Sequence, residues 1–309
     1  MTKASQFPPF DAEPKAPQLR QSSGFPAQSP PQRQIFSVGM TGLAFLLGGV
    51  ALLPLGAILA EIVRQGLAHF SGEVLVSLPA PVGMTGVANG FANAILGTLI
   101  MVGIAALLSI PLGVIAAVFL TEFGQDMRLL QVIRFMVVVL SGVPSIVVGV
   151  FVYGMIVLAT KQFSALAGSV ALAVIMLPII ILATESALNL VPLSQRMAAA
   201  ALGANRMQTT LWVVITAALP GITTGVLLAI ARAAGETAPL IFTALFSQNW
   251  PEGLNSPTPS LSVLIYNYAN SPFIEQNDMA WTAALVLLGL VLTINILARL
   301  VMRHRIPLR

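Results

Sequence analysis

Long stretches without a charged residue limit what this chain can fold into. The first of them extends from Gln34 to Ala60 and is predominantly apolar. At about 1.5 Å of rise per residue, a helix of that length crosses the roughly 30 Å of hydrocarbon in a bilayer. Over the whole chain 57% of residues are hydrophobic and 8% are charged, whereas a soluble domain carries about 25% charged residues. We therefore expect a membrane protein whose main solvent is lipid.

The charges between the apolar stretches predict six membrane-spanning helices, and hence an all-α fold. Pro111 is expected to bend the second span, and Lys161 alone separates the third from the fourth. The predicted spans are residues 34–60, 91–120, 135–160, 162–184, 221–246 and 281–301. Together they form a six-span domain over residues 35–303.

The fifth span is the hardest to delimit, because Leu211 to Phe246 is too long for one span and too short for two. Proline is tolerated in the first turn of a helix and is costly in its interior. We therefore begin the fifth span near Gly221, directly after Pro220, and end it near Phe246. Residues 211–218 then form a short helix at the cytoplasmic surface.

Both ends of the chain are predicted to be tails. Residues 1–34 are rich in proline, glutamine and serine, and such a segment buries too little apolar surface to offset the entropy of ordering, so we predict a disordered tail. Residues 304–309 form a short C-terminal tail. Because the predicted number of spans is even, the two tails lie on the same side of the membrane.

The basic residues predict which side that is. Twelve of them fall on the side of the tails, and only Arg64 and Lys161 fall on the other side. Positive charge accumulates in cytoplasmic loops, so we expect cytoplasmic tails. The net charge of +4 is interpreted as this orienting charge, and no nucleic-acid partner is expected. The twelve are Lys3, Lys15, Arg20, Arg33, Arg128, Arg134, Arg196, Arg206, Arg299, Arg303, Arg305 and Arg309.

Missing residues exclude several kinds of chemistry. The chain has no cysteine, so it has no disulfide, thiolate metal site or cysteine nucleophile. His69 and His304 are far apart in the sequence, and we predict no metal site. None of the three lysines, Lys3, Lys15 and Lys161, stands in the Gly-Lys-Ser/Thr context of a phosphate-binding loop. We expect a protein that is not an enzyme, binds no cofactor of its own and does not hydrolyse ATP by that loop.

One arginine lies inside a predicted span. Arg232 is followed four residues later by Glu236, on the same face of a helix. An arginine near the bilayer centre costs about 2.5–3.5 kcal/mol, so its presence needs a reason. The pair is either a structural clamp or part of a path for a charged substrate, and we favour the path, because a partly neutralised arginine attracts an anion without trapping it. Glu185 is interpreted as a helix-end charge, and Glu122 and Asp126 as solvated loop charges.

A run of small residues from Met197 to Gly203 occupies the predicted loop between the fourth and fifth spans, residues 190–210. Alanine and glycine side chains let another backbone approach closely. We therefore expect a docking surface that takes mechanical work from a soluble partner.

This loop resembles the EAA motif in the permeases of binding-protein-dependent ABC importers, which reads Glu-Ala-Ala, three further residues and Gly. The spacing matches, but Met197 stands where the family has its glutamate. The resemblance implies a type I importer permease fold, also called MetI-like, and a coupling helix that docks into a groove of an ATPase subunit. The residues assigned to this coupling loop are Arg196, Met197, Ala198, Ala199, Gly203 and Ala204.

Two longer segments resemble the phosphate permeases of the same family. They are Ser141–Gly149 and Leu227–Thr243, and the second contains Arg232 and Glu236. The resemblance implies that inorganic phosphate is the substrate and that these two charged residues lie on the translocation path. It also implies a homologous second permease chain, two ATPase subunits that bind the ATP, and a periplasmic phosphate-binding protein. The same resemblance implies a location in the cytoplasmic membrane of a bacterium.

Other functions remain open on the sequence alone. The chain could serve an importer of another oxyanion, such as molybdate, sulfate or phosphonate. It could also be a secondary transporter or channel that acts without an ATPase. A role in reporting phosphate status to a sensor is compatible with any importer of this kind.

Overall fold

The computed structural model describes residues 31–84, 86–123 and 128–305, and these residues form helices and connecting loops without a strand among them. The all-α prediction is confirmed. Predictions for residues 1–30, Asp126 and residues 306–309 lie outside the described residues. The helices are α1 (Pro31–Ala68), η1 (Gly72–Leu75), α2 (Ala92–Val118), η2 (Phe119–Phe123), α3 (Arg128–Gly142), α4 (Ser145–Val152), η3 (Tyr153–Val157), α5 (Leu158–Thr160), α6 (Ala165–Asn189), α7 (Leu193–Ala201), α8 (Arg206–Gln208), η4 (Thr209–Val214), α9 (Ile215–Ala234), α10 (Ala238–Thr243), α11 (Leu261–Ala269) and α12 (Ile274–Arg305).

Five helical stretches in the described part of the chain are long and apolar enough to cross a membrane, and a bent pair brings the number to six. The chain divides into two compact units, with the boundary inside α1 between Ala57 and Ile58. In the first unit, α1 begins at Pro31, so residues 31–34 are helical and the predicted tail boundary is wrong there. Proline suits the first position of a helix, where its missing amide hydrogen has no partner to lose. At the other end of the chain, α12 continues to Arg305, beyond the predicted boundary at 303.

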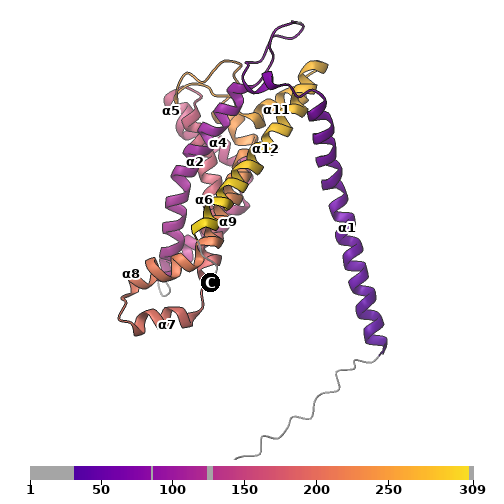
Figure 1. Ribbon diagram of the computed structural model, residues 1–309. Helices are drawn as coiled ribbons and strands as arrows, with labels where there is room; N and C mark the ends of the chain where they lie inside the picture. The colour runs from indigo at the N-terminus through magenta and orange to yellow at the C-terminus, as the bar shows by residue number, and fades with distance from the viewer. Residues whose placement is uncertain (1–30, 85, 124–127, 306–309) are drawn as a thin grey trace, which may run out of the picture. The chain divides into compact units, whose positions relative to one another are not determined.

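In the second unit, α6 is the central helix. Of its most apolar stretch 67% is buried inside the protein, against 6% for α12. Leu172, Met176 and Ile180 of α6 are fully buried, and they pack with Met101 of α2 and Ala229 of α9 in one core cluster. Helices α2 and α9 therefore flank α6, and Figure 1 shows the three running together through the bundle.

Helices α6 and α9 approach each other through small residues. A Cβ atom added at Gly225 would lie 2.3 Å from Cβ of Ala183, and one added at Gly221 would lie 2.7 Å from Cβ of Ala187. Two glycines four residues apart on one helix facing two alanines four residues apart on another is the small-residue packing typical of membrane helices. The contact fixes α9 against α6 almost backbone to backbone.

The predicted fifth span is wrong at both ends. The span extends from Arg206 to Ala234, so the surface helix predicted over residues 211–218 is its first part, and Pro220 lies inside α9. The preceding turn, η4, is a π-helix, and membrane helices accept an interior proline where such local adjustments and neighbouring groups satisfy the backbone. Arg232 consequently lies in the last turn of α9, not at mid-span.

The predicted third span is broken. Helix α3 ends at Gly142, α4 begins at Ser145, and the two directions differ by 105°. Pro144 has no amide hydrogen to donate and disfavours the α conformation at Val143. This break falls inside the segment Ser141–Gly149 that resembles the phosphate permeases.

The loop helices α7 and α8 lie at one end of the bundle, toward the end of α12, whereas α5 and α11 lie at the opposite end (Figure 1). The small-residue patch and the C-terminal part of the chain are therefore at the same end of the second unit. This agrees with the sidedness that the basic residues predict.

Candidate functional site

The small-residue patch forms α7, which closes on a glycine in the left-handed conformation. Helix α7 ends at Ala201, and Gly203 has a φ of 85°. The amide of Gly203 donates to the carbonyl of Ala200 (3.0 Å), and the amide of Ala204 donates to the carbonyl of Ala199 (3.1 Å). This is the Schellman arrangement that ends many helices on a glycine. A Cβ at Gly203 would meet nothing within 4 Å, so within this chain the backbone conformation is what favours glycine.

Helix α7 presents an apolar surface to its surroundings. Leu193, Met197 and Leu202 are 69%, 63% and 90% exposed, and Ala199 is the buried residue of α7. Leu193 and Met197 are four residues apart and share one face of α7, and exposed apolar patches on folded proteins mark contact sites for other proteins. Of the residues assigned to the coupling loop, the structure places Met197, Ala198 and Gly203 at the surface, Ala199 inward and Ala204 between the two.

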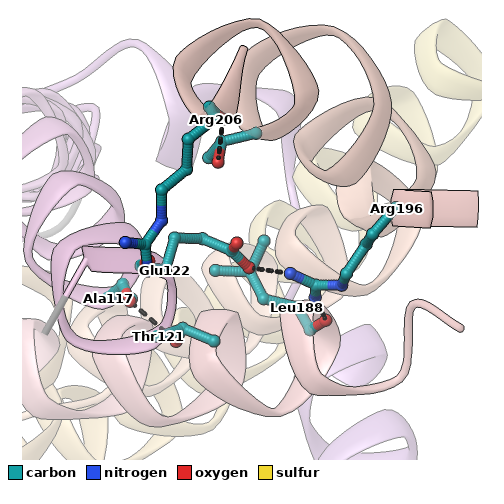
Figure 2. A network of polar contacts seen from close by, with 7 residues as sticks. Ala117, Thr121, Glu122, Leu188, Arg196 and Arg206 are labelled. Carbon is teal, nitrogen blue, oxygen red and sulfur yellow. Dashed lines mark hydrogen bonds and ion pairs between the residues drawn. The ribbon is translucent and has the colours of Figure 1, made fainter. Parts of the chain in front are cut away.

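Arg196 points from α7 into the protein, where it joins two spans. Its Nη1 donates to Oε1 of Glu122 at 2.5 Å, and its Nη2 donates to the carbonyl oxygen of Leu188 at 2.9 Å. Leu188 belongs to the last turn of α6, and Glu122 lies in η2 at the end of the second span. Figure 2 shows the guanidinium of Arg196 between these two acceptors. One side chain therefore connects the coupling helix to the ends of α6 and α2.

Arg206, near the C-terminal end of the coupling loop, also contacts Glu122. Its Nη2 donates to the carbonyl oxygen of Glu122, and its guanidinium carbon lies 5.3 Å from the centre of the Phe123 ring, within the range of a cation–π contact. Glu122 thus lies between the two arginines, with its carboxylate on Arg196 and its backbone on Arg206 (Figure 2).

Glu122 is a buried charge, and the prediction that it is a solvated loop charge is wrong. The residue is 7% exposed, and in the ion pair the side chains of Glu122 and Arg196 are 8% and 23% exposed. Removing one partner of a buried pair strands the other, which typically costs about 3–5 kcal/mol. The position of Glu122 at the end of a span suggested solvent, and its partner is 74 positions away in the sequence. The two arginines of the loop were a signal that an acidic partner was needed.

Glu185 is paired as well. Its Oε1 lies 2.5 Å from Nη2 of Arg134, and the side chain of Glu185 is 14% exposed. The pair joins α3 to α6 near the end of α6. The interpretation of Glu185 as a helix-end charge holds for its position, but the carboxylate is buried against Arg134 instead of lying open at the interface.

The Arg232–Glu236 pair exists and is loose. Nε of Arg232 lies 3.4 Å from Oε1 of Glu236, and the two side chains are 53% and 15% exposed. Among the described residues Glu236 is the hydrogen-bond partner of this arginine, whereas a guanidinium carries five N–H donors. The backbone of Glu236 is fixed, because its carbonyl accepts from the hydroxyl of Ser262 at 2.8 Å. The arrangement offers unused donors on a positive group beside a positioned carboxylate.

The two segments that resemble phosphate permeases come together around this pair. Arg232 lines a small cavity of about 20 Å³ with Ser141 and Ser145, which flank the break between α3 and α4. A Cβ added at Gly149 would lie 2.6 Å from Cα of Pro239. Glycine at 149 therefore lets α4 lie against α10, which continues the chain after Glu236. Discontinuous helices at membrane depth are found where a substrate path needs polar groups.

Comparison with known proteins agrees with this architecture. Residues 109–307, more than half of the chain, match the family described as binding-protein-dependent transport system inner membrane components. The chain belongs to that family. Its relatives include the phosphate transport system permease protein PstA of Haemophilus influenzae, 40% identical over 86% of this chain and 93% of the relative. They also include the probable phosphate transport system permease protein PstA of Methanocaldococcus jannaschii, 36% identical over 85% of this chain and 94% of the relative.

Solved structures support the fold. A chain of the inward-facing MetNI methionine ABC transporter superposes with a TM-score of 0.57 at 20% identity, covering 70% of this chain and 96% of that chain. A chain of a bacterial alginate ABC transporter superposes with a TM-score of 0.60 at 14% identity, covering 86% and 94%. At these identities the likeness concerns the fold, and the predicted MetI-like permease fold is confirmed.

Proposed function

We propose that this chain is the permease subunit of an ATP-driven importer that carries inorganic phosphate across the cytoplasmic membrane. The observation that carries the proposal is the match, at 36–42% identity over most of the chain, to proteins named phosphate transport system permease PstA. The strongest local support is the segment that holds Arg232 and Glu236, which belongs to the same resemblance.

The proposed assembly contains a PstC-like second permease, two PstB-like ATPase subunits and a PstS-like periplasmic binding protein. In this assembly α7 docks on an ATPase, and both tails of the chain lie in the cytoplasm. The exposed apolar side chains of Leu193, Met197 and Leu202 supply the docking surface. ATP, held by the ATPase subunits, drives their closure, and the resulting push on α7 turns the spans between inward-facing and outward-facing arrangements.

Arg232 and Glu236 are proposed to contact phosphate on the path. The half-exposed guanidinium offsets the charge of an oxyanion with donors that Glu236 leaves free. The carboxylate of Glu236 is an acceptor, which a phosphate that retains a proton can satisfy by donating to it, whereas sulfate has no proton to donate. This chemistry favours phosphate over sulfate, whereas a phosphonate can retain a proton as phosphate does.

The test is ATP-dependent uptake of radiolabelled inorganic phosphate into proteoliposomes that contain the complete complex. We expect uptake only when ATPase, binding protein and ATP are all present, and little competition from sulfate or molybdate. Uptake by the purified chain without an ATPase would establish the stand-alone transporter instead. Preferential uptake of molybdate or sulfate would establish the other oxyanion importer.

A further inference from the structure

The end of the second span is held to the coupling loop at two points. Helices α6 and α9 are connected to this loop through the chain itself, because α6 leads into α7 and α8 leads through η4 into α9. Helix α2 has no such connection. It ends in η2, where Glu122 meets Arg196 from the start of the loop and Arg206 from its end.

We propose that Glu122 is a positioning residue that makes the end of α2 move with the coupling loop when the ATPases push on α7. The inference rests on the proposed function and extends it, because it names a polar contact that, beside the packing of α2 on α6, ties to the loop the end of a span that the chain does not connect to it. The motif's glutamate position holds Met197, whose side chain faces outward. Glu122 is the carboxylate that engages this loop from inside.

The geometry suits a rigid connection. The carboxylate of Glu122 is 8% exposed, so water does not readily replace Arg196 as its partner. Two nitrogens of Arg196 donate to two acceptors, the carboxylate of Glu122 in η2 and the carbonyl of Leu188 in α6. Two acceptors fix the orientation of the planar guanidinium. Arg206 adds a backbone contact and packs over Phe123. A displacement of α7 therefore carries the end of α2 along with that of α6.

The chain offers a matched control in the Arg134–Glu185 pair. Its nitrogen–oxygen distance is the same 2.5 Å and Glu185 is 14% exposed, although Arg134 is 52% exposed and Arg196 is 23% exposed. This pair connects α3 to α6 and includes no residue of the coupling loop. Glu185→Gln removes an ion pair of the same kind without touching the proposed connection.

The experiment compares phosphate transported per ATP hydrolysed in proteoliposomes of the complete complex, with radiolabelled inorganic phosphate. Assembly is measured by the amount of ATPase that copurifies with the permease chains. In Glu122→Gln we expect normal copurification and continued ATP hydrolysis, with phosphate per ATP reduced about fivefold or more, the lower range of measured coupling between sites. Arg196→Lys keeps the charge but loses the two-acceptor geometry, and we expect a smaller loss of the same kind. Glu185→Gln should leave the ratio at the wild-type value.

The proposal is overturned if Glu122→Gln and Arg196→Lys assemble and keep the wild-type ratio, or if Glu185→Gln lowers it as much. It is also overturned if Glu122→Gln and Arg196→Lys both fail to assemble, because Glu122 would then be needed to build the complex and not to couple it. Failure of the proposed function looks different. In that case the wild-type complex itself moves no phosphate, whereas failure of the coupling role leaves wild-type transport intact.

Discussion

The two ends of α9 are held in different ways. Toward the coupling loop, Gly221 and Gly225 lie against alanines of α6 so closely that a methyl group would collide. At the other end, the backbone is packed through Ala229 and Ala233, but the side chain of Arg232 is half exposed and only loosely paired. On the proposed function, the contrast assigns two tasks to one span: the tight end transmits movement, and the open charge at the far end meets the substrate.

The largest effect is expected from removing the open charge. Arg232→Gln should reduce phosphate uptake by the complete complex to background while the complex still assembles, because an amide cannot offset the charge of an anion. The measurement is uptake of radiolabelled phosphate beside ATPase copurification. Arg134→Gln serves as the control, since that arginine pairs with Glu185 away from the proposed path. Near-normal uptake in Arg232→Gln would make the Arg232–Glu236 pair a structural clamp.

The next largest effect concerns the docking surface of α7, which the chain connects through α8 and η4 to the tight end of α9. Gly203→Asp places a charged side chain at the end of α7 and should lower ATPase copurification or phosphate per ATP by about tenfold or more, as for a central interface residue. Gly83→Asp is the matched control, because Gly83 has nearly the same φ, 84°, also has open space around it and lies in a different loop. If both variants behave alike, the effect comes from the backbone conformation and not from docking.

A smaller effect is expected from the contact between α6 and α9. Gly225→Ala brings a methyl group to 2.3 Å from Cβ of Ala183, and overpacking of this kind destabilises by about 1–3 kcal/mol. The midpoint of thermal unfolding of the purified complex should fall. Gly103→Ala in α2, where nothing lies within 4 Å of the added atom, should leave it unchanged or raise it slightly, because alanine favours a helix more than glycine does. Equal midpoints would show that the two helices adjust without cost.

The smallest effect tests selectivity at the open end. Glu236→Gln replaces an acceptor-only carboxylate with a group that can also donate, so sulfate should compete with phosphate uptake more strongly. We expect the sulfate concentration that halves phosphate uptake to fall about fivefold, consistent with about 1 kcal/mol for one hydrogen bond. The measurement is the ratio of the concentrations of sulfate and unlabelled phosphate that halve uptake in the same preparation. An unchanged ratio would show that Glu236 does not determine selectivity between the two anions.

Much of this architecture could be predicted from apolar length and charge alone. The spans around α2, α6 and α12 were located in the sequence, and so were the small-residue loop and the Arg232–Glu236 pair. The limits of the fifth span were predicted wrongly, because a proline rule for isolated helices does not include the π-helical turn before α9 or the packing on α6. The break at Pro144 carried a visible signal, since proline restricts the residue before it.

Glu122 shows what a single sequence does not reveal. Its burial depends on Arg196 and Arg206, which are distant in the chain and arrive only when the loop folds back against the second span. Charge patterning reports pairs at a fixed spacing along the chain, such as Arg232 and Glu236, four residues apart, although α9 ends at Ala234 and Glu236 lies just beyond it. It has no comparable spacing rule for pairs between helices.

The place of Arg232 in the last turn of α9 has an energetic consequence. That turn lies about 25 Å along the helix from Ile215, and Arg232 lines its small cavity with Val174, Ile175 and Ile179 from the middle of α6. On the proposed function, an anion held there still has part of the electric field to cross, and each negative charge moved into a cell whose interior is negative costs about 2.3 kcal/mol per 100 mV. Capture at Arg232 would then lower the barrier to entry, but the inward journey would be electrically uphill and would draw on ATP.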